Sequence, residues 1–308
     1  MNSIVDFHAD DYALSENSDN DIISLCKTGF LDSISIIPNL KIFNSAVSKF
    51  FAAKNSFNKE ILVSVHLNFM EGRCCAEKAL LPNLVDSNGY FNISWGTLIE
   101  WNYNPIIRKK IKQQLKTEIT SQIEKCTDSG ICDKNALRVD SHQHTHMIPL
   151  VFEALADSLD DLKTKGFKAA YIRNTFDPLC FYNGKDLFSL NTIKCMILNF
   201  YSHKIRKYLN RKNLPLNYLC GVYYSGRMDF RIEKVIPVFA EKAKENSMNV
   251  ELLFHPGTML KDEITEEFTK VGFNEFHLSA GRKIEFEELK TILINYGNND
   301  EIRRLSDL

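Results

Sequence analysis

The stretch that decides the fold is Ile4-Val5-Asp6-Phe7-His8-Ala9-Asp10-Asp11, a short apolar run that leads directly into two carboxylates. Similar short runs, rich in β-branched residues, recur along the chain at residues 33–37, 61–67, 136–141, 169–173, 220–224 and 250–255. Longer patterns typical of amphipathic helices separate them. This alternation predicts βα units and a parallel sheet of about seven strands.

Helices are expected over residues 18–29, 109–125, 233–245 and 285–294. No repeat or low-complexity linker interrupts the alternation, so we expect a single domain over residues 1–308. Residues 70–105 and 180–218 have a weaker pattern. We interpret them as loop excursions over the mouth of a barrel, where such folds place specificity.

The composition excludes some classes of protein. With 308 residues and 44% hydrophobic residues, the chain can bury a large core. Its net charge of −1 provides no overall field for nucleic acid. The first residues carry acids where a signal peptide needs a basic flank, and no apolar run approaches the ~20 residues of a membrane span. The eight cysteines form no C-x-x-C pair, so we expect free thiols and a cytoplasmic location.

Four polar clusters follow apolar runs, at residues 8–11, 65–68, 140–146 and 254–257. Because parallel strands deliver their carboxyl ends to one face of a barrel, these clusters should converge. The pair Asp10 and Asp11 suits a bound cation, which relieves the repulsion between the two carboxylates. The alternative is an exposed turn that caps the next helix.

Residues 140–146 give the strongest indication of a metal site. If this stretch stays extended, Asp140, His142, His144 and His146 lie on one face. Imidazole is a common ligand of catalytic metals, and a carboxylate or carbonyl usually holds its other nitrogen, so some of these residues should support the ligands instead. The alternative is a surface histidine cluster.

His66 ends an apolar run and is either a further ligand or a structural residue. Pro256 favours extended geometry at His255, which should hold that imidazole at the mouth of the barrel. The role of His8 is open, whereas His203 and His277 are not expected to take part. Arg173 should either contact substrate or orient an acid, or else pair with a carboxylate at the surface.

These residues resemble the patterns of the YdjC-like, or ChbG-like, carbohydrate deacetylase family, in order from about residue 4 to 290. The matching motifs are Ala9-Asp10-Asp11-Tyr12-Ala13-Leu14-Ser15, Ser64-Val65-His66-Leu67, Asp140-Ser141-His142-Gln143-His144-Thr145-His146, Ile172-Arg173, Ser225-Gly226 and His255-Pro256-Gly257. Four residues depart from the family pattern: His8 replaces its usual Asn, Tyr12-Ala13 its Phe-Gly, and Ser64 its Gly.

The resemblance implies a distorted (β/α) barrel, similar to a TIM barrel, that removes the N-acetyl group of an amino sugar. It implies that Asp11, His66 and His142 bind one divalent metal ion, with Asp10 as base and His255 as acid. Zinc or magnesium is expected, and manganese and cobalt also suit this ligand set.

Other interpretations remain open from the sequence. A metal-dependent hydrolase of a phosphoester or another amide would use the same barrel, and a protein that binds a metal or sugar without chemistry would not need Asp10 and His255. Residues 187–212 mix apolar and basic side chains, which favours either a helix packed on the barrel or contact with an anionic membrane and a lipid-linked sugar. A homodimer is the commonest arrangement of soluble oligomers.

Overall fold

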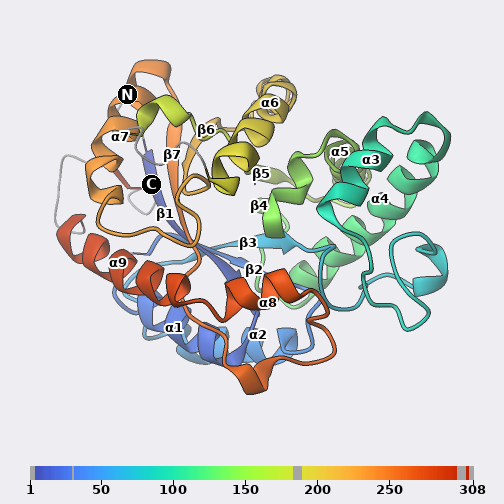
Figure 1. The fold of residues 1–308 in the computed structure, drawn as a ribbon, viewed down its shortest axis with the longest axis horizontal. Coiled ribbons are helices and arrows are strands. Elements are labelled where there is room, and N and C mark those ends of the chain that lie inside the picture. Colours follow the sequence, from blue (N-terminus) through green and yellow to red (C-terminus); the bar gives the residue numbers. More distant parts are fainter. Residues whose placement is uncertain (1–3, 30, 183–188, 297–302, 305–308) are drawn as a thin grey trace.

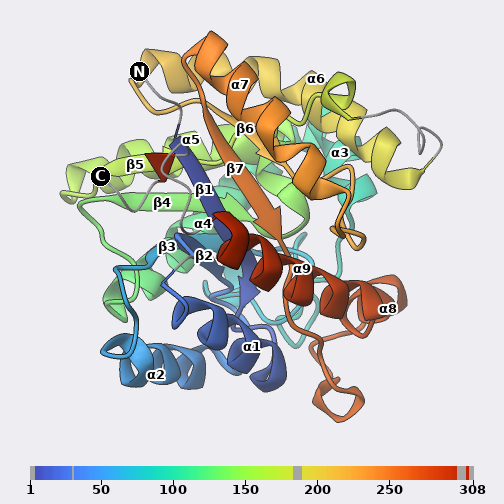
Figure 2. The same ribbon diagram turned by 90° about the vertical axis from the view of Figure 1, so that its left-hand side faces the viewer.

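The apolar runs correspond to the parallel strands of one sheet in the computed structural model, which describes residues 4–29, 31–182, 189–296 and 303–304. These strands are β1 Ile4–Tyr12, β2 Ser33–Ile36, β3 Leu62–Leu67, β4 Leu137–Ser141, β5 Ala169–Ile172, β6 Asn217–Cys220 and β7 Asn249–Phe254. Their order is β5-β4-β3-β2-β1-β7-β6, and a short β8, Arg303–Arg304, pairs with β1. The sheet curls into a half-barrel, as predicted (Figures 1 and 2).

The position of β6 corrects the prediction of a strand at 220–224. The backbone N–H groups of Val222 and Tyr223 both donate to a carboxylate oxygen of Asp177, at 3.0 Å each, rather than to a neighbouring strand. This carboxylate follows β5 and draws the chain out of the sheet, so that β6 ends at Cys220.

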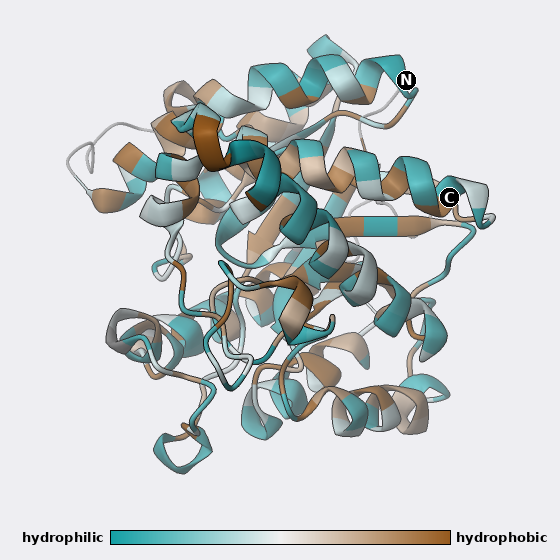
Figure 3. Cartoon of the chain, turned by 90° about the vertical axis from the view of Figure 1, so that its right-hand side faces the viewer, coloured by the Kyte–Doolittle hydropathy of each residue, from teal (hydrophilic) through white to brown (hydrophobic). Residues whose placement is uncertain are grey.

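Helices surround the sheet, and Figure 3 shows hydrophilic and hydrophobic residues interspersed along them. They are α1 Glu16–Cys26, α2 Phe43–Lys54, α3 Trp95–Tyr103, α4 Pro105–Asp128, α5 Pro149–Thr164, α6 Leu190–Arg211, α7 Ile236–Asn246, α8 Val271–His277 and α9 Ala280–Tyr296. Ser15 caps α1, so this helix begins before the predicted Ser18. Pro105 at the first turn starts α4 earlier than predicted.

The two weakly patterned segments contain regular structure. Residues 70–105 include a 3₁₀ turn at Lys78–Leu80, the bridges Arg73–Tyr90 and Val85–Phe91, and α3. Most of residues 189–218 is the long helix α6, which buries one face that includes Cys195, Leu198 and Ile205.

Alternation along β1 separates two environments. Val5, Phe7 and Ala9 belong to the hydrophobic core. The intervening residues, Asp6, His8 and Asp10, are also buried but contact polar side chains on neighbouring strands, such as Ser33, Ser35, Arg138 and Arg173. The interior of the half-barrel is therefore a polar network, and the apolar core lies between the sheet and the helices.

The structure also bears on the expected free thiols and on the search for a membrane span. All eight cysteines are free, and most of them are buried. Among the described residues, none of the helices combines the length and the apolar character needed to cross a bilayer.

Candidate metal centre and active site

A bulge in β1 brings Asp10 and Asp11 to the same site, although adjacent residues of a regular strand point to opposite faces. Ala9 pairs with Ile34 and Tyr12 with Ile36, so β1 carries one residue more than β2 between these pairs. Asp11 adopts a left-handed backbone with φ 68°, and Ala13 does so with φ 69°. Glycine adopts a left-handed backbone at the lowest steric cost, which explains why glycine suits position 13 in the family pattern.

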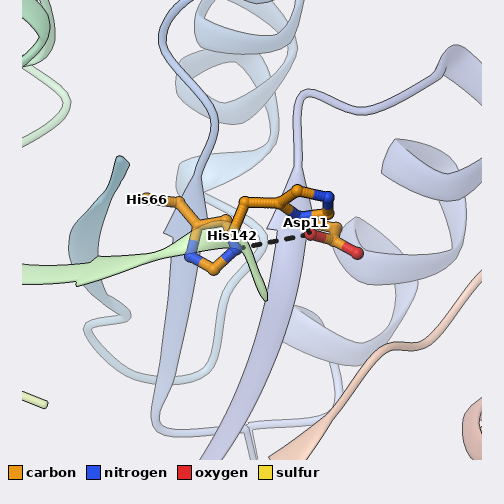
Figure 4. Close-up of side chains that lie close together, drawn as sticks. All are labelled: Asp11, His66 and His142. Atoms are coloured by element: carbon orange, nitrogen blue, oxygen red, sulfur yellow. Dashed lines mark hydrogen bonds and ion pairs between the residues drawn. The ribbon is translucent and has the colours of Figure 1, made fainter. Parts of the chain in front are cut away.

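Asp11, His66 and His142 converge from the bulge in β1, the end of β3 and the turn after β4 (Figure 4). Asp11 Oδ1 lies 2.9 Å from His142 Nδ1 and 3.4 Å from His66 Nε2. All three side chains are buried. Burial alone would raise the pKa of Asp11, but His142 and Arg282 hold that pKa well below its usual range.

The arrangement of these three residues fits a divalent cation. Their ligand atoms lie within 4.8 Å of one another, and one carboxylate with two imidazoles is a donor set common to catalytic metal sites. Burial would lower the pKa of His66, yet Asp10 and Asp140 raise it to about 10. An environment this negative also favours a metal ion.

The turn after β4 corrects the prediction that residues 140–146 stay extended. The strand ends at Ser141, and His142–Met147 forms a tight turn in which Gln143 and His144 are left-handed, each with φ 58°. The histidines therefore do not share one face. His142 alone reaches Asp11, because the turn carries the later two residues away.

His146 and His144 are buried beside the centre without joining the three-residue ligand cluster. The His146 ring donates from Nε2 to the Arg173 carbonyl at 2.8 Å and accepts at Nδ1 from the Ser141 hydroxyl. Burial lowers the pKa of His146 to about 4, so this imidazole is neutral and supports the turn. His144 Nδ1 has no hydrogen-bond partner among the described residues.

Asp10 is clamped by Arg173, which is fully buried and so cannot be a surface arginine. The guanidinium donates to both carboxylate oxygens of Asp10, at 2.9 and 2.8 Å, and also contacts Glu251 and Asp140. Burial would raise the pKa of Asp10, but Arg173 and His66 outweigh it and hold that pKa well below the usual range. Arg173 thus keeps Asp10 ionised and oriented.

Asp140 and His8 complete the polar floor of the site. Asp140 Oδ1 lies 2.6 Å from His66 Nδ1, which directs His66 Nε2 toward Asp11. The His8 ring lies between Ser33 and Ser35, and its Nε2 is 3.0 Å from Asp10 Oδ1.

His255 lies at the outer side of the site, after β7. Its side chain is 12% exposed, and its Nε2 lies 4.0 Å from Asp10 Oδ2. The backbone N–H of His255 donates to Glu285, whose carboxylate also lies 3.4 Å from His255 Nδ1.

Three charged residues at the site, Arg282, Glu285 and Glu71, escaped the sequence analysis, and His277, which was not expected to take part, lies beside them. Arg282 donates to Asp11 Oδ2 at 2.7 Å, Glu285 holds His255, and Glu71 contacts both His142 and His277. Arg282 and Glu285 come from α9, His277 from α8, and Glu71 from the loop after β3. The spacing of Arg282 and Glu285 could have indicated that both lie on one face of a helix. Nothing in the local sequence, however, indicates which face of that helix meets the barrel.

Comparisons with known proteins identify the family of this chain. The family model described as YdjC-like protein matches residues 5–291. A carbohydrate deacetylase of Xenopus laevis is 25% identical over 304 residues, covering 92% of this chain and 89% of that protein. A carbohydrate deacetylase of Clostridium beijerinckii is 27% identical over 150 residues, which is 49% of this chain and 54% of that one.

One solved structure, a candidate cellobiose-phosphate cleavage protein of Enterococcus faecalis V583, aligns with a TM-score of 0.56 and 17% identity. The alignment covers 94% of this chain and 95% of that one, and it shows a shared fold. Because the family model spans nearly the whole sequence, this chain belongs to the YdjC-like protein family.

Proposed function

We propose that the protein hydrolyses the N-acetyl group of an acetylated amino sugar in an oligosaccharide or glycoconjugate, with one divalent cation held by Asp11, His66 and His142. The observation that carries the proposal is the convergence of these ligands with Asp10 and His255 on one buried site. The carbohydrate deacetylase relatives support the substrate class. Zinc, magnesium, manganese and cobalt all suit the donor set.

A cation bound there would polarise the acetamide carbonyl and lower the pKa of a water molecule. Asp10 is the proposed base. Its carboxylate is kept ionised by Arg173, and its Oδ2 lies 3.9 Å from His66 Nε2, beside the ligand cluster. Asp10 therefore accepts the proton of the water that attacks the carbonyl carbon.

His255 is the proposed acid. Its Nε2 lies close to Asp10 but on the more exposed side of the site, where the sugar would enter. As the C–N bond of the acetamide breaks, His255 gives a proton to the departing sugar amine, and acetate is the second product. General acid and base terms of this kind contribute about 10²–10⁴-fold each to the rate.

Acetate release tests the proposal. N-acetylglucosamine oligomers are incubated with the protein, with and without a chelator, and single metals are then added back. Chelator-sensitive release that a metal restores is expected. No release from any acetylated sugar, by protein that holds a stoichiometric metal, would overturn the substrate class.

A phosphatase assay on the same preparation separates the rival phosphoesterase. Both arginines at the centre are bound by carboxylates: Arg173 by Asp10 and Glu251, and Arg282 by Asp11. These carboxylates already neutralise the guanidinium charge that a phosphoryl group would need, so we expect acetate release to exceed phosphate release.

A second candidate, deacetylation of a lipid-linked amino sugar at an anionic membrane surface, is favoured by the outward face of α6. Leu190, Ile193, Met196 and Phe200 are all more than half exposed and recur every three to four residues. The same face continues with the exposed Lys207 and Arg211. Apolar and cationic groups on one helix face suit an anionic lipid surface.

The corner between α3 and α4 lies beside α6 and contacts Tyr201, a buried residue next to the outward face. The hydroxyl groups of Tyr103 and Tyr201 lie 3.3 Å apart, which places the end of α3 beside α6 (Figure 2). Tyr103 and Ile106 are themselves exposed.

Flotation with vesicles that contain anionic phospholipid tests this candidate. The protein should float, and the double substitution Ile193→Ser and Phe200→Ser should abolish flotation. Phe230→Ser, which removes an equally exposed aromatic residue elsewhere, is the control. A wild-type protein that stays in the aqueous fraction would remove the membrane candidate and leave the deacetylase proposal unaffected.

A further inference from the structure

We propose that Glu71, held by His277, is a positioning residue that orients His142 for cation binding. The inference rests on the cation centre of the proposed function and adds to it two residues on its far side. It is carried by the contacts of the His142 ring and by three buried polar atoms around that ring.

The His142 ring lies between two carboxylates. Its Nδ1 is 2.9 Å from Asp11 Oδ1, on the side of the ligand cluster, and its Nε2 is 3.6 Å from Glu71 Oε2 on the other side. A neutral imidazole binds a metal through one nitrogen and carries its proton on the other. With Nδ1 as the ligand atom, that proton is on Nε2 and faces Glu71.

The polar atoms on this side of the ring are incompletely satisfied. His142 Nε2, Glu71 Oε1 and His277 Nδ1 are all buried without a hydrogen-bond partner among the described residues. Orphaned buried polar groups are costly, so a small closure of the 3.6 Å gap upon cation binding would be favourable.

The backbone around Glu71 is rigidly held. The carboxamides of Asn39 and Asn68 both donate to its carbonyl, at 2.7 and 3.1 Å. The next residue, Gly72, has φ 75°, and a Cβ there would lie 2.6 Å from a Leu40 methyl group. His277 Nε2 lies 3.0 Å from Glu71 Oε2 and fixes the side chain. Glu71 thus approaches His142 from a fixed position.

The other ligand histidine has the same kind of support. His66 Nδ1 lies 2.6 Å from Asp140, while His66 Nε2 faces Asp11. Each histidine of the cluster therefore has a carboxylate behind it. Such outer carboxylates fix the ring orientation and tautomer, and their loss typically weakens metal binding about 10–100-fold.

Glu71, His142 and His277 are close enough to hold a cation of their own. However, His142 would then have to bind a metal through both nitrogens, which requires loss of its second proton. An imidazole that serves one cation and donates to Glu71 avoids this, so a single cation per chain is expected.

Equilibrium dialysis against buffered zinc and cobalt, without substrate, tests the inference. Glu71→Gln should bind about 10–100-fold more weakly than wild type. Glu71→Asp and His277→Gln should lie between the two. Glu267→Gln is the matched control, because this carboxylate is buried to a similar extent but accepts from the Lys41 backbone and faces no imidazole. Circular dichroism spectra and urea unfolding verify that each variant folds.

The outcomes are distinct. Wild-type binding of one cation that is unchanged in a folded Glu71→Gln variant would overturn the positioning role and leave the centre intact. Two cations in wild type, reduced to one by His277→Gln, would overturn it in favour of a second metal site. No cation in wild type, or one that His66→Ala fails to weaken, would instead reject the centre of the proposed function.

Discussion

Asp10 and Asp11 are adjacent residues with different partners. Substitutions on the two sides of the site should therefore have different effects on cation binding and turnover. Asp11 faces His66 and His142, whereas Asp10 is clamped by Arg173. Asp10→Asn should retain the cation and lose about 10²–10⁴-fold in turnover, because the amide cannot accept the proton. Metal analysis and acetate release, measured on the same sample, check both statements. Near-normal turnover would rule out Asp10 as the base.

His142→Ala is the complementary variant at the same centre. It removes a proposed ligand, so it should lose the cation and, as a consequence, the activity. If this variant kept a stoichiometric cation, the ligand assignment would be wrong even if Asp10→Asn behaved as expected.

Substitution of Arg173 should lower the stability of the protein by a predictable amount. Its guanidinium neutralises Asp10, Asp140 and Glu251 in a fully buried network. Arg173→Met leaves these carboxylates uncompensated and should lower the free energy of unfolding by about 3–5 kcal/mol. In Arg108→Met, which breaks the partly exposed pair with Glu153, the loss should stay below about 1 kcal/mol. Urea unfolding of both variants compares them, and equal losses would contradict the prediction.

Helix α9 acts as one element that fixes two loops of the site. Its Arg282 binds Asp11 and the Gly257 carbonyl, and its Glu285 accepts from the backbone of Gly226 and His255. This docking needs close contact at Gly281, where a Cβ would lie only 2.2 Å from the Gly226 carbonyl oxygen.

Gly281→Ala should therefore displace α9, lower the unfolding midpoint and reduce activity through His255. Gly272→Ala in α8 is the control: nothing lies within 4 Å of its Cβ, and alanine in a helix should be neutral or stabilising by about 1 kcal/mol. Thermal unfolding and acetate release measure both variants. A Gly281→Ala protein that matched wild type would show that α9 has room to shift.

Two strands show where the alternation of residues in the sequence predicts side-chain direction and where it does not. Period-two alternation places Asp6, His8 and Asp10 on the interior face of β1, since that segment is extended. The same reasoning fails for residues 140–146. There the chain turns at His142, and a hydrogen bond from the His146 backbone to Ser141 Oγ stabilises the turn. A sequence pattern does not reveal where a strand stops when the stop depends on such contacts.

At the scale of the whole molecule, the proposed cation would join three segments that lie more than fifty residues apart along the chain. Because an unfolded chain does not hold Asp11, His66 and His142 together, the cation binds the folded state preferentially. A free cation concentration of 100 times Kd should raise the free energy of unfolding by about 2.7 kcal/mol. Urea unfolding with buffered metal or with a chelator measures this. His66→Ala should lose the response, and an unchanged wild-type midpoint would contradict the cation centre.

The sequence by itself determined the strand and helix alternation, the parallel sheet and the polar residues at strand ends, because these depend on local hydrophobic period and chain direction. The tertiary structure alone decided which charges meet. Arg173 is buried in a network of three carboxylates, and a bulge turns Asp10 and Asp11 toward one site. Glu71 arrives from the loop after β3, whereas His277, Arg282 and Glu285 arrive from the last two helices. Such encounters depend on how helices pack against the sheet, which is a property of the entire fold.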